Sequence, residues 1–402
     1  MTYQPPAGAR DLLPLEVAQK AWINDRLQQV FQQWGYQRIV TSTLELLDTL
    51  TAGGAIDPAT VIQLRDNSQG TLGLRPEVTA SIARAAVTRM AGNTYPQRLC
   101  YRANIFRNSP QSHHGRQLEH YQAGVELLFA GGVLADAEMI LLLANCLQEL
   151  GVPNWQILMG QAELTRSLLA VFPTEIRPQI RHCIANLDRI ALENLDLKPA
   201  LQERALFLFD LRGKPETVLA KVETLDLDAA TLNTVNNLKS LVNLINSSSP
   251  NPIPLTLDLS LLQTFDYYTG MVFEAVSFET NQSYILGQGG RYDQLLGLYH
   301  PQGETAPGIG FSLNIEDIHA SLAATKQLPQ QVKPSDWLVI PESSDAAIAA
   351  FNYADQLRNS QPGIRVEIDL GDRSPEEVRN YAKTCRIANL AWIKPDGSIV
   401  ER

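Results

Sequence analysis

Polar clusters interrupt the apolar segments of this 402-residue chain and could hold a small polar ligand. They lie in residues 74–79, 101–126, 265–274 and 287–293. Side chains that accept hydrogen bonds from an ammonium group or a ring N–H recur in the first two clusters: Glu77, Thr79, Gln122 and Glu126. In the third cluster, Tyr267 and Tyr268 add hydroxyl groups and flat aromatic faces. These residue types are suited to binding a small molecule that carries an ammonium group.

Each cluster also has a purely structural interpretation. Glu77 could be a helix-start carboxylate, with Arg75 as its ion-pair partner. The pair Gly289-Gly290 could form a hairpin turn. The neighbouring His113 and His114 lack the carboxylate or cysteine partners that a metal site needs, so we interpret them as a solvated loop pair.

Cysteine spacing and charge exclude several classes of protein. The four cysteines lie far apart without a CxxC motif, so we expect reduced thiols rather than disulfides or a zinc site. The chain has 33 basic and 43 acidic residues and a formal net charge of −10, which repels polyanions at long range. No apolar run reaches the roughly 18 to 20 residues of a membrane span, and the first residues lack the apolar middle of a signal peptide. We therefore expect a soluble cytoplasmic protein.

The apolar pattern predicts the elements that must position these clusters. Apolar residues at three- and four-residue steps predict a helix over residues 14–35, and the β-branched segment 36–43 predicts a strand. A helix is expected near residues 135–150. Further strands are expected at residues 99–106, 122–128, 256–259, 271–277 and 308–312. The polar clusters thus fall in strands or in the loops beside them.

Two breaks divide the chain. Residues 161–245 are leucine-rich with helical spacing and residues 246–254 (NSSSPNPIP) read as a linker, which together predict a helical insertion in a sheet domain. The second break, at residues 326–335, precedes alternating strands and helices. The strands are predicted at residues 337–340, 364–370 and 389–393, and the helices near 345–359 and 375–384. This alternation predicts a small C-terminal α/β unit.

In their order along the chain, the four clusters resemble the elements that build the amino-acid pocket of histidyl-tRNA synthetases. The resemblance spans nearly the whole chain. Residues 8–14 (GARDLLP) resemble the start of that family, residues 106–116 its motif 2 loop, and residues 122–126 (QAGVE) the strand that follows. Residues 266–274 (DYYTGMVFE) resemble its histidine-specific signature, and residues 289–293 (GGRYD) and 308–311 (GIGF) complete the series. So many ordered matches argue against chance agreement.

The resemblance implies an α+β fold of the class II aminoacyl-tRNA synthetase type, with an antiparallel sheet, flanking helices and usually a dimer. We expect this domain over residues 1–325, with the helical insertion at about 161–250. A truncated α/β domain at residues 335–402 resembles an anticodon-binding domain. The resemblance also implies a set of histidine-binding residues: Glu77, Thr79, Arg107, Arg116, Gln122, Glu126, Tyr267 and Tyr268. Of these, Arg107 would face the carboxylate of the ligand, and the tyrosines would line its ring.

On the nucleotide side, the chain departs from the synthetase pattern. Where the synthetases carry arginines, this chain has Gln263 before the histidine signature and Asp317 in motif 3. Two unit charges at 4 Å interact by about 4 kcal/mol at an effective dielectric of 20, so Asp317 should repel a triphosphate. Ser109 replaces a motif 2 glutamate, and Ser42 replaces the motif 1 proline. We expect that the amino-acid pocket is kept while the synthetase chemistry is lost.

A histidine-binding synthetase relative without aminoacylation resembles one bacterial family, the regulatory subunits of ATP phosphoribosyltransferase. That resemblance implies a subunit that the short catalytic chain needs for activity, and that confers feedback inhibition by L-histidine on the first step of histidine biosynthesis. It also implies a hetero-octamer built on synthetase-like dimers. No cofactor, metal or membrane is expected. No tRNA partner is expected either, since residues 336–402 hold 8 basic and 11 acidic side chains.

Two alternatives remain open at this point. An active histidyl-tRNA synthetase with unusual substitutions is favoured by the retained Glu77, Arg107, Arg116 and Tyr268. The second alternative is a scaffold or sensor for another complex, in which the pocket is kept for folding alone. Histidine-dependent pyrophosphate exchange would test the first, and calorimetry with histidine would test the second.

Overall fold

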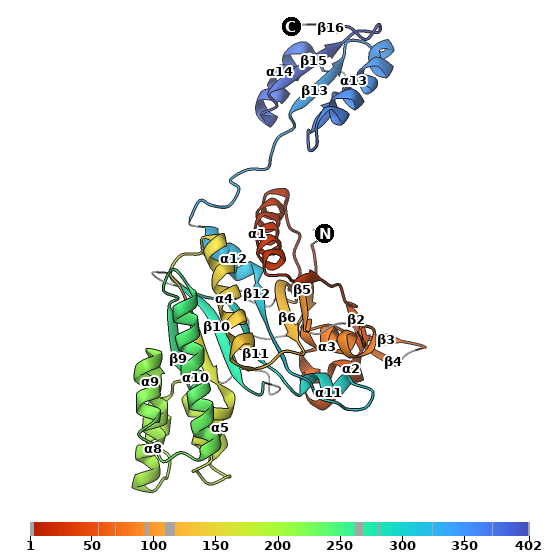
Figure 1. Ribbon diagram of the computed structural model, residues 1–402. Helices are drawn as coiled ribbons and strands as arrows, with labels where there is room; N and C mark the ends of the chain where they lie inside the picture. The colour runs from red at the N-terminus through yellow and green to blue at the C-terminus, as the bar shows by residue number, and fades with distance from the viewer. Residues whose placement is uncertain are drawn as a thin grey trace. The chain divides into compact units, whose positions relative to one another are not determined.

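The computed structural model describes residues 4–54, 56–68, 70–92, 96–108, 117–261, 268–279, 282–323, 325–371 and 373–400. The chain divides into two compact units, Met1–Pro329 and Gln330–Arg402 (Figure 1). Each unit has its own sheet and its own buried apolar cluster.

Unit 1 is built on a sheet whose described strands number nine, in the order β1-β5-β6-β12-β11-β10-β7-β9-β8. The strands are β1 (Gln37–Arg38), β5 (Gln97–Phe106), β6 (Glu119–Leu128), β12 (Gly308–Asn314), β11 (Gln282–Arg291), β10 (Met271–Glu279), β7 (Trp155–Gln161), β9 (Leu255–Asp258) and β8 (Arg212–Gly213). From β5 to β7 every neighbouring pair is antiparallel, whereas β1 with β5 and β7 with β9 are parallel. The expected α+β class with an antiparallel central sheet is confirmed.

Three helices pack together against this sheet: α1 (Pro14–Gln33), α4 (Gly132–Leu150) and α12 (Ile315–Ala323). The predicted apolar face of α1 is buried, because Ile23, Leu27 and Phe31 are at most 2% exposed. Helix α4 is apolar on most of its surface, since it contacts α1, α10 and β12. It ends at Gly151, whose φ of 66° is the left-handed conformation that glycine adopts easily.

A smaller sheet and helix α3 (Thr79–Thr88) carry the first polar cluster. The sheet has the order β2-β4-β3, with β2 at Leu44–Leu46, β4 at Gly70–Leu74 and β3 at Ile62–Asp66. The short helices α2 (Leu47–Leu50), η1 (Ala52–Gly54) and η2 (Pro58–Thr60) lie between its strands in sequence. Helix α3 contacts α11 (Leu295–Tyr299), and a buried apolar cluster around Ile82 joins them. The segment between β4 and α3 is thereby held at the edge of the main sheet.

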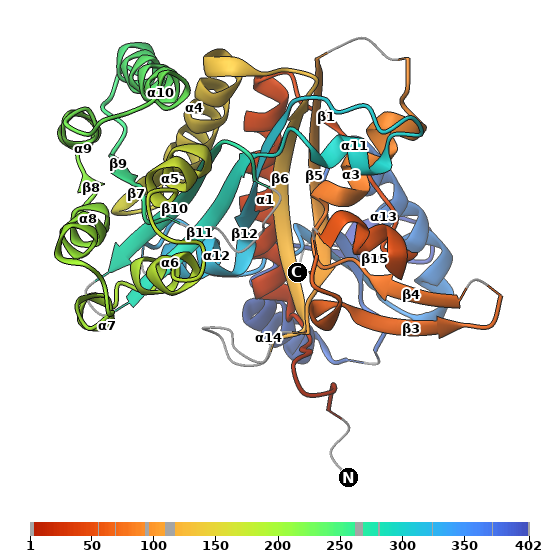
Figure 2. The same cartoon turned by 90° about the horizontal axis from the view of Figure 1, so that it is seen from below.

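Between β7 and β9 the chain forms a mostly helical insertion, seen on one side of the sheet in Figure 2. Its helices are α5 (Ala162–Leu169), α6 (Arg177–Ala185), α7 (Arg189–Glu193), α8 (Pro199–Phe209), α9 (Pro215–Val222) and α10 (Ala229–Ser248). Helix α10 continues to Ser248, so the predicted linker begins later than its composition indicates.

In its described residues, unit 2 has a four-stranded sheet in the order β14-β13-β15-β16 and two α-helices. Strand β13 (Trp337–Pro341) pairs in parallel with β14 (Val366–Ile368) and β15 (Asn389–Ile393), and β16 (Ile399–Val400) is antiparallel to β15. The helices are α13 (Ala347–Ser360), which follows η3 (Ser344–Ala346), and α14 (Pro375–Cys385). Helix α14 begins with a capping box, in which Ser374 and Glu377 satisfy each other's backbone N–H groups.

One strand prediction and one structural interpretation were wrong. The strand predicted over residues 36–43 is only Gln37–Arg38. The N–H of Ile39 still donates to the carbonyl of Cys100 in β5, but residues 40–43 belong to no strand. The pair Gly289-Gly290 lies inside β11 and forms no hairpin turn. Glycine disfavours strands by propensity, but here both residues face close neighbours: a Cβ on Gly290 would lie 2.7 Å from the ring of Tyr268.

The four cysteines are all free, and three of them are buried. In the ranges given above, no group of three or more histidine, cysteine or acidic side chains could hold a metal ion. No helix of the described chain combines the length and the apolar character that crossing a membrane requires.

Candidate functional site

Glu126 lies at the centre of the candidate site. It projects from β6 and is 1% exposed. Its Oε1 accepts a hydrogen bond from Thr79 Oγ1 at 2.7 Å, and its Oε2 accepts one from the hydroxyl of Tyr292. The opposite residue on β12 is Gly310, where a Cβ would lie 2.0 Å from Glu126 Oε2. Only a glycine at this register position leaves room for the carboxylate.

The protonation of Glu126 follows from its surroundings. Burial raises its pKa from 4.5 to about 8, because a carboxylate loses its hydration inside the protein. The hydrogen bonds from Tyr292 and Thr79 act in the opposite direction, and the nearby Glu77 raises the pKa further. A bound cation would reverse this shift by stabilising the ionised form.

Glu77 is a second buried carboxyl group in the same site. Its Oε1 accepts a hydrogen bond from the backbone N–H of Ala80 at 2.8 Å, as expected for a helix-start carboxylate. Its Oε2 is buried and has no hydrogen-bond partner among the described residues. Burial raises the pKa of Glu77, and the charge of Arg107 lowers it in part. One oxygen of Glu77 therefore serves the fold, and the other is a buried acceptor whose hydrogen bond is not supplied by the described residues.

The proposed ion pair between Glu77 and Arg75 is wrong. The guanidinium of Arg75 donates instead to the backbone carbonyls of Asn104 at 3.0 Å and of Thr41 at 2.9 Å. Arg75 is 5% exposed and ties the segment before α3 to β5. Its role is to hold the backbone that carries Glu77.

Gln122 and Arg107 border the same region. Gln122 is 8% exposed and lies four residues before Glu126 on β6, so both side chains leave the same face of the strand. Arg107 follows β5, and its Nε donates to the carbonyl of Pro76 at 2.8 Å. This bond places a cation beside the backbone of Glu77.

Two tyrosines that sequence reasoning left out of the site belong to it. Tyr101 on β5 is 4% exposed and pairs with Gly124 of β6. Burial raises the pKa of its hydroxyl well above 10, and the charges of Glu126 and Glu77 add to the effect. Tyr292 is 1% exposed and donates to Glu126. The signal for Tyr292 was present, since it is part of the GGRYD motif at residues 289–293.

An ion-pair network supports the segment that contains Tyr268. Arg291 is 7% exposed and donates from Nε to Asp136 at 3.0 Å and from Nη1 to Asp293 at 3.1 Å. The carbonyl of Arg291 accepts from the backbone N–H of Thr269 at 2.8 Å. Because Thr269 follows Tyr268 directly, the network fixes where that tyrosine leaves the backbone.

The start of α12 is acidic. Asp317 is 9% exposed and accepts a hydrogen bond from the side chain of Asn314. Next to it, Glu316 forms a buried ion pair with Lys20 of α1 at 3.0 Å. Acidic side chains are stabilised at a helix N-terminus, so this acidic pair has a structural explanation in addition to any effect on ligands.

The structure brings together most of the expected site and leaves part of it outside the described residues. Glu77, Thr79, Arg107, Glu126 and Tyr268 surround one region between α3, β5, β6 and β11, and Gln122 lies on the same face of β6 as Glu126. The predictions for Arg116, Tyr267, Gln263, Ser109, His113 and His114 all lie outside the described residues.

Comparison with known proteins agrees with this geometry. The family model for histidyl-tRNA synthetase matches residues 8–318. A Gloeothece citriformis protein described as ATP phosphoribosyltransferase regulatory subunit is 66% identical over 401 residues, covering 99% of this chain and 98% of the relative. A Rippkaea orientalis protein with the same description is 65% identical over 398 residues, with the same coverage.

Solved structures give the same result. A Bacillus halodurans protein described as ATP phosphoribosyltransferase regulatory subunit/histidyl-tRNA synthetase aligns with a TM-score of 0.81 and 25% identity, over 98% of this chain and 99% of that one. Histidyl-tRNA synthetase from Nostoc has the same fold, with a TM-score of 0.79 and 19% identity over 98% of this chain and 92% of that one. The chain therefore belongs to the family of ATP phosphoribosyltransferase regulatory subunits, and its larger unit has the fold of a histidyl-tRNA synthetase.

Proposed function

We propose that this chain is a non-catalytic subunit that activates the short catalytic chain of ATP phosphoribosyltransferase and makes it sensitive to L-histidine. The observation that carries the proposal is the pair of buried carboxyl groups, Glu77 and Glu126, in a chain of this family. The assembly would be a cytoplasmic hetero-octamer built on dimers of this chain.

The carboxyl pair gives the pocket a preference for cations. Ionising both buried carboxyl groups without a nearby cation costs much free energy, and the pKa of Glu126 is accordingly raised to about 8. The ammonium group of an amino acid would restore the ionised forms and would give Glu77 Oε2 the donor that it lacks. A ligand without this ammonium group would leave the carboxyl groups uncompensated.

The remaining residues supply the other contacts of a free histidine. Arg107 would pair with the α-carboxylate, because it is the cation next to Glu77. Thr79 and Gln122 offer donors and acceptors to the amine or the imidazole. The aromatic rings of Tyr101 and Tyr268 would enclose the ligand's ring, together with Tyr267 and Arg116 from outside the described residues.

Regulation would follow from linkage between this pocket and the subunit interface. Histidine must bind one quaternary state of the complex better than the other, and a coupling free energy of about 1 to 3 kcal/mol is sufficient. The segment from β5 to β6 is the element that would transmit this preference, because it carries Glu126 and Arg107.

Loss of synthetase chemistry is part of the proposal. Asp317 at the start of α12 places a negative charge where the resembling family has an arginine, and Gln263 is neutral at a second such position. Adenylate formation needs cations around the phosphates, and electrostatic stabilisation usually contributes more to catalysis than any other single effect. The chain would therefore bind histidine without activating it.

Reconstitution with the short catalytic chain tests the proposal. Adding this chain should switch on phosphoribosyl transfer to ATP, and L-histidine should inhibit the mixture. The Glu126→Gln chain should still activate the partner while losing sensitivity to histidine, which separates assembly from ligand binding. If the activity of the catalytic chain and its inhibition by L-histidine were the same with and without this chain, the proposal would be refuted.

An active histidyl-tRNA synthetase is the second candidate, because the family model over residues 8–318 carries that description and Arg107 lies beside the pocket. It requires histidine-dependent pyrophosphate exchange by the purified chain. Exchange at a rate typical of synthetases would replace the regulatory proposal. The scaffold alternative requires instead that calorimetry shows no heat of histidine binding.

A further inference from the structure

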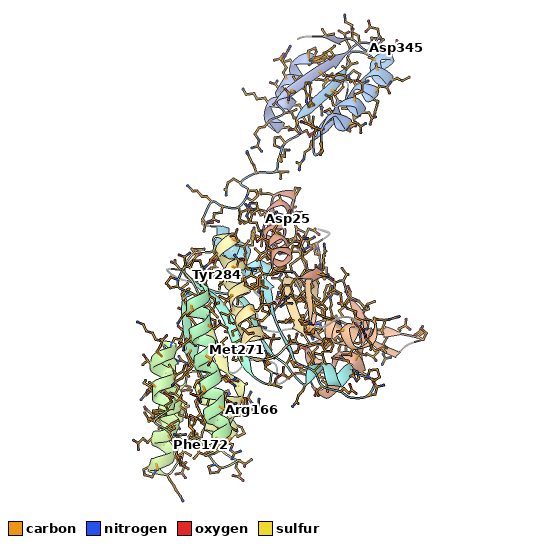
Figure 3. The ribbon with its side chains drawn as sticks, in the orientation of Figure 1. Asp25, Arg166, Phe172, Met271, Tyr284 and Asp345 are labelled. Carbon is orange, nitrogen blue, oxygen red and sulfur yellow. The ribbon has the colours of Figure 1, made fainter. Side chains whose placement is uncertain are left out.

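A basic cavity lies in the helical insertion, outside the candidate histidine site. Its volume is about 630 Å³, and it lies between α5 and α6. Charged or titratable residues on its wall are all basic: Arg166, Arg177, Arg181 and His182. Leu169 and Pro178 give it an apolar part. Figure 3 labels Arg166 and Phe172 in this region.

Backbone carbonyls hold two of these arginines in place. Arg177 donates from Nε to the carbonyl of Phe172 at 2.6 Å and from Nη2 to that of Ala170 at 2.8 Å. Arg166 donates from Nη2 to the carbonyl of Thr269 at 3.3 Å. Such bonds orient a guanidinium group without neutralising its charge. Neither arginine has a carboxylate partner in the part of the chain that the structure describes.

Two arginines elsewhere in the insertion, Arg189 and Arg212, do have carboxylate partners. Arg189 pairs with Glu193 at 2.9 Å and with Asp210 at 3.2 Å, and Arg212 pairs with Asp258 at 3.4 Å. In a chain with a net charge of −10, acidic partners are abundant. Among the residues that the structure describes, the cavity wall nevertheless holds three arginines and no acidic residue. The need for a charged, soluble surface does not by itself explain this arrangement.

We propose that this cavity binds the phosphate groups of a small phosphorylated metabolite, through the juxtaposed guanidinium groups of Arg166, Arg177 and Arg181. Guanidinium groups match phosphate oxygens in bidentate geometry, and several of them suit a ligand with two or more negative charges. The volume falls within the range of roughly 300 to 1,000 Å³ typical of small-molecule sites. The apolar residues would contact the part of the ligand that carries the phosphates. This inference goes beyond the regulatory role and does not depend on it.

Inorganic pyrophosphate is the probe that tests the cavity. Calorimetry on the full chain at low ionic strength should show one site, and added salt should weaken binding because the interaction is between charges. Arg181→Gln removes an exposed charge and should weaken pyrophosphate binding about tenfold or more, the effect expected for one charge-assisted hydrogen bond. Arg189→Gln, which removes an arginine elsewhere in the insertion, should leave it unchanged.

A second variant separates the shape of the Arg177 guanidinium group from its charge. Arg177→Lys keeps the charge and loses the bidentate guanidinium, so it should also weaken binding, with circular dichroism confirming that the helices remain. Equal affinities for the native chain, Arg181→Gln and Arg189→Gln would overturn the proposal, as would the absence of pyrophosphate binding to the native chain. Histidine binding measured on the same variants should be unchanged, which keeps this test independent of the regulatory role.

Discussion

Thr79 donates its hydroxyl hydrogen to Glu126 across 2.7 Å, and so joins the first turn of α3 to β6. The other carboxylate oxygen of Glu126 accepts from Tyr292. Two donors from distant parts of the chain thus orient one buried carboxyl group before any ligand arrives. A preorganised acceptor of this kind binds more tightly because it loses little freedom on binding.

Replacing Glu126 by glutamine should abolish most of the affinity for L-histidine. The variant keeps the shape of the side chain but removes the charge that faces the ammonium group. A hydrogen bond to a charged group contributes about 1.5 to 3 kcal/mol, so the dissociation constant should rise about 10- to 100-fold in calorimetry. Glu119→Gln, on the opposite face of β6, is the matched control and should bind as the native chain does. Equal effects of both variants would remove Glu126 from the site.

The raised pKa of Glu126 predicts that stability falls as the pH rises. In the unfolded chain the carboxyl group has its ordinary pKa of 4.5, and in the folded chain about 8. The folded state therefore holds the proton more strongly, and the stability from this group is fully present below about pH 4.5 and is lost as the pH rises through 8. Urea unfolding should show a slope of up to about 1.4 kcal/mol per pH unit between pH 5 and 8. This slope should flatten in Glu126→Gln.

Histidine binding should depend on pH for the same reason. Below pH 8 the ammonium group must displace a proton from Glu126, so binding should release a proton. Calorimetry at pH 7 in buffers with different ionisation enthalpies measures this release directly. Glu126→Gln should release fewer protons than the native chain. Identical proton release in both proteins would contradict the assignment.

Tyr292→Phe should lower both stability and histidine affinity. The change leaves one oxygen of Glu126 without its donor and raises the pKa of that carboxyl group further, since the bond from Tyr292 lowers it. An unsatisfied buried acceptor costs about 1 to 3 kcal/mol, which urea unfolding would detect. Tyr36→Phe is the matched control, because Tyr36 donates to Glu138 at 2.8 Å and makes no hydrogen bond to Glu126. It should lose stability without losing histidine affinity.

The order of the motifs along the sequence was sufficient to identify part of the site. Glu77, Thr79 and Glu126 have types and positions that resemble those of a known family, and the structure brings Thr79 and Glu126 into contact. Helix α1 followed from apolar spacing, since burial on one face produces that spacing directly.

The missed features depend on contacts between distant segments. Tyr101 in a strand is typical of a core residue, and only its position beside the carboxyl groups gives it a second role. The glycines of β11 disfavour a strand locally, and what retains them is the close approach of Tyr268 to Gly290. Such approaches follow from tertiary packing, which the periodicity of a single chain does not encode.

Gly310→Ala should damage the histidine site through Glu126. The new methyl group would lie 2.0 Å from Glu126 Oε2, so the carboxylate would have to move away from its donors. Histidine affinity should fall by at least as much as in Glu126→Gln. Gly371→Ala is the control, because its nearest neighbouring atom would be 3.6 Å away. If Gly310→Ala bound histidine normally, the carboxylate would not be held as described.

Arg291→Met should be among the most destabilising single changes in the larger unit. It leaves the largely buried Asp136 without its cation, and breaking a buried ion pair from one side costs about 3 to 5 kcal/mol. The double variant Asp136→Leu with Arg291→Met should regain much of this loss in urea unfolding, because no charge is then left buried. Histidine affinity should stay reduced in the double variant, since Asp293 has lost its partner in the network beside Thr269. If the double variant recovered both its stability and its histidine affinity, apolar side chains could replace the ion pairs, and the ion pairs would not position the Tyr268 segment.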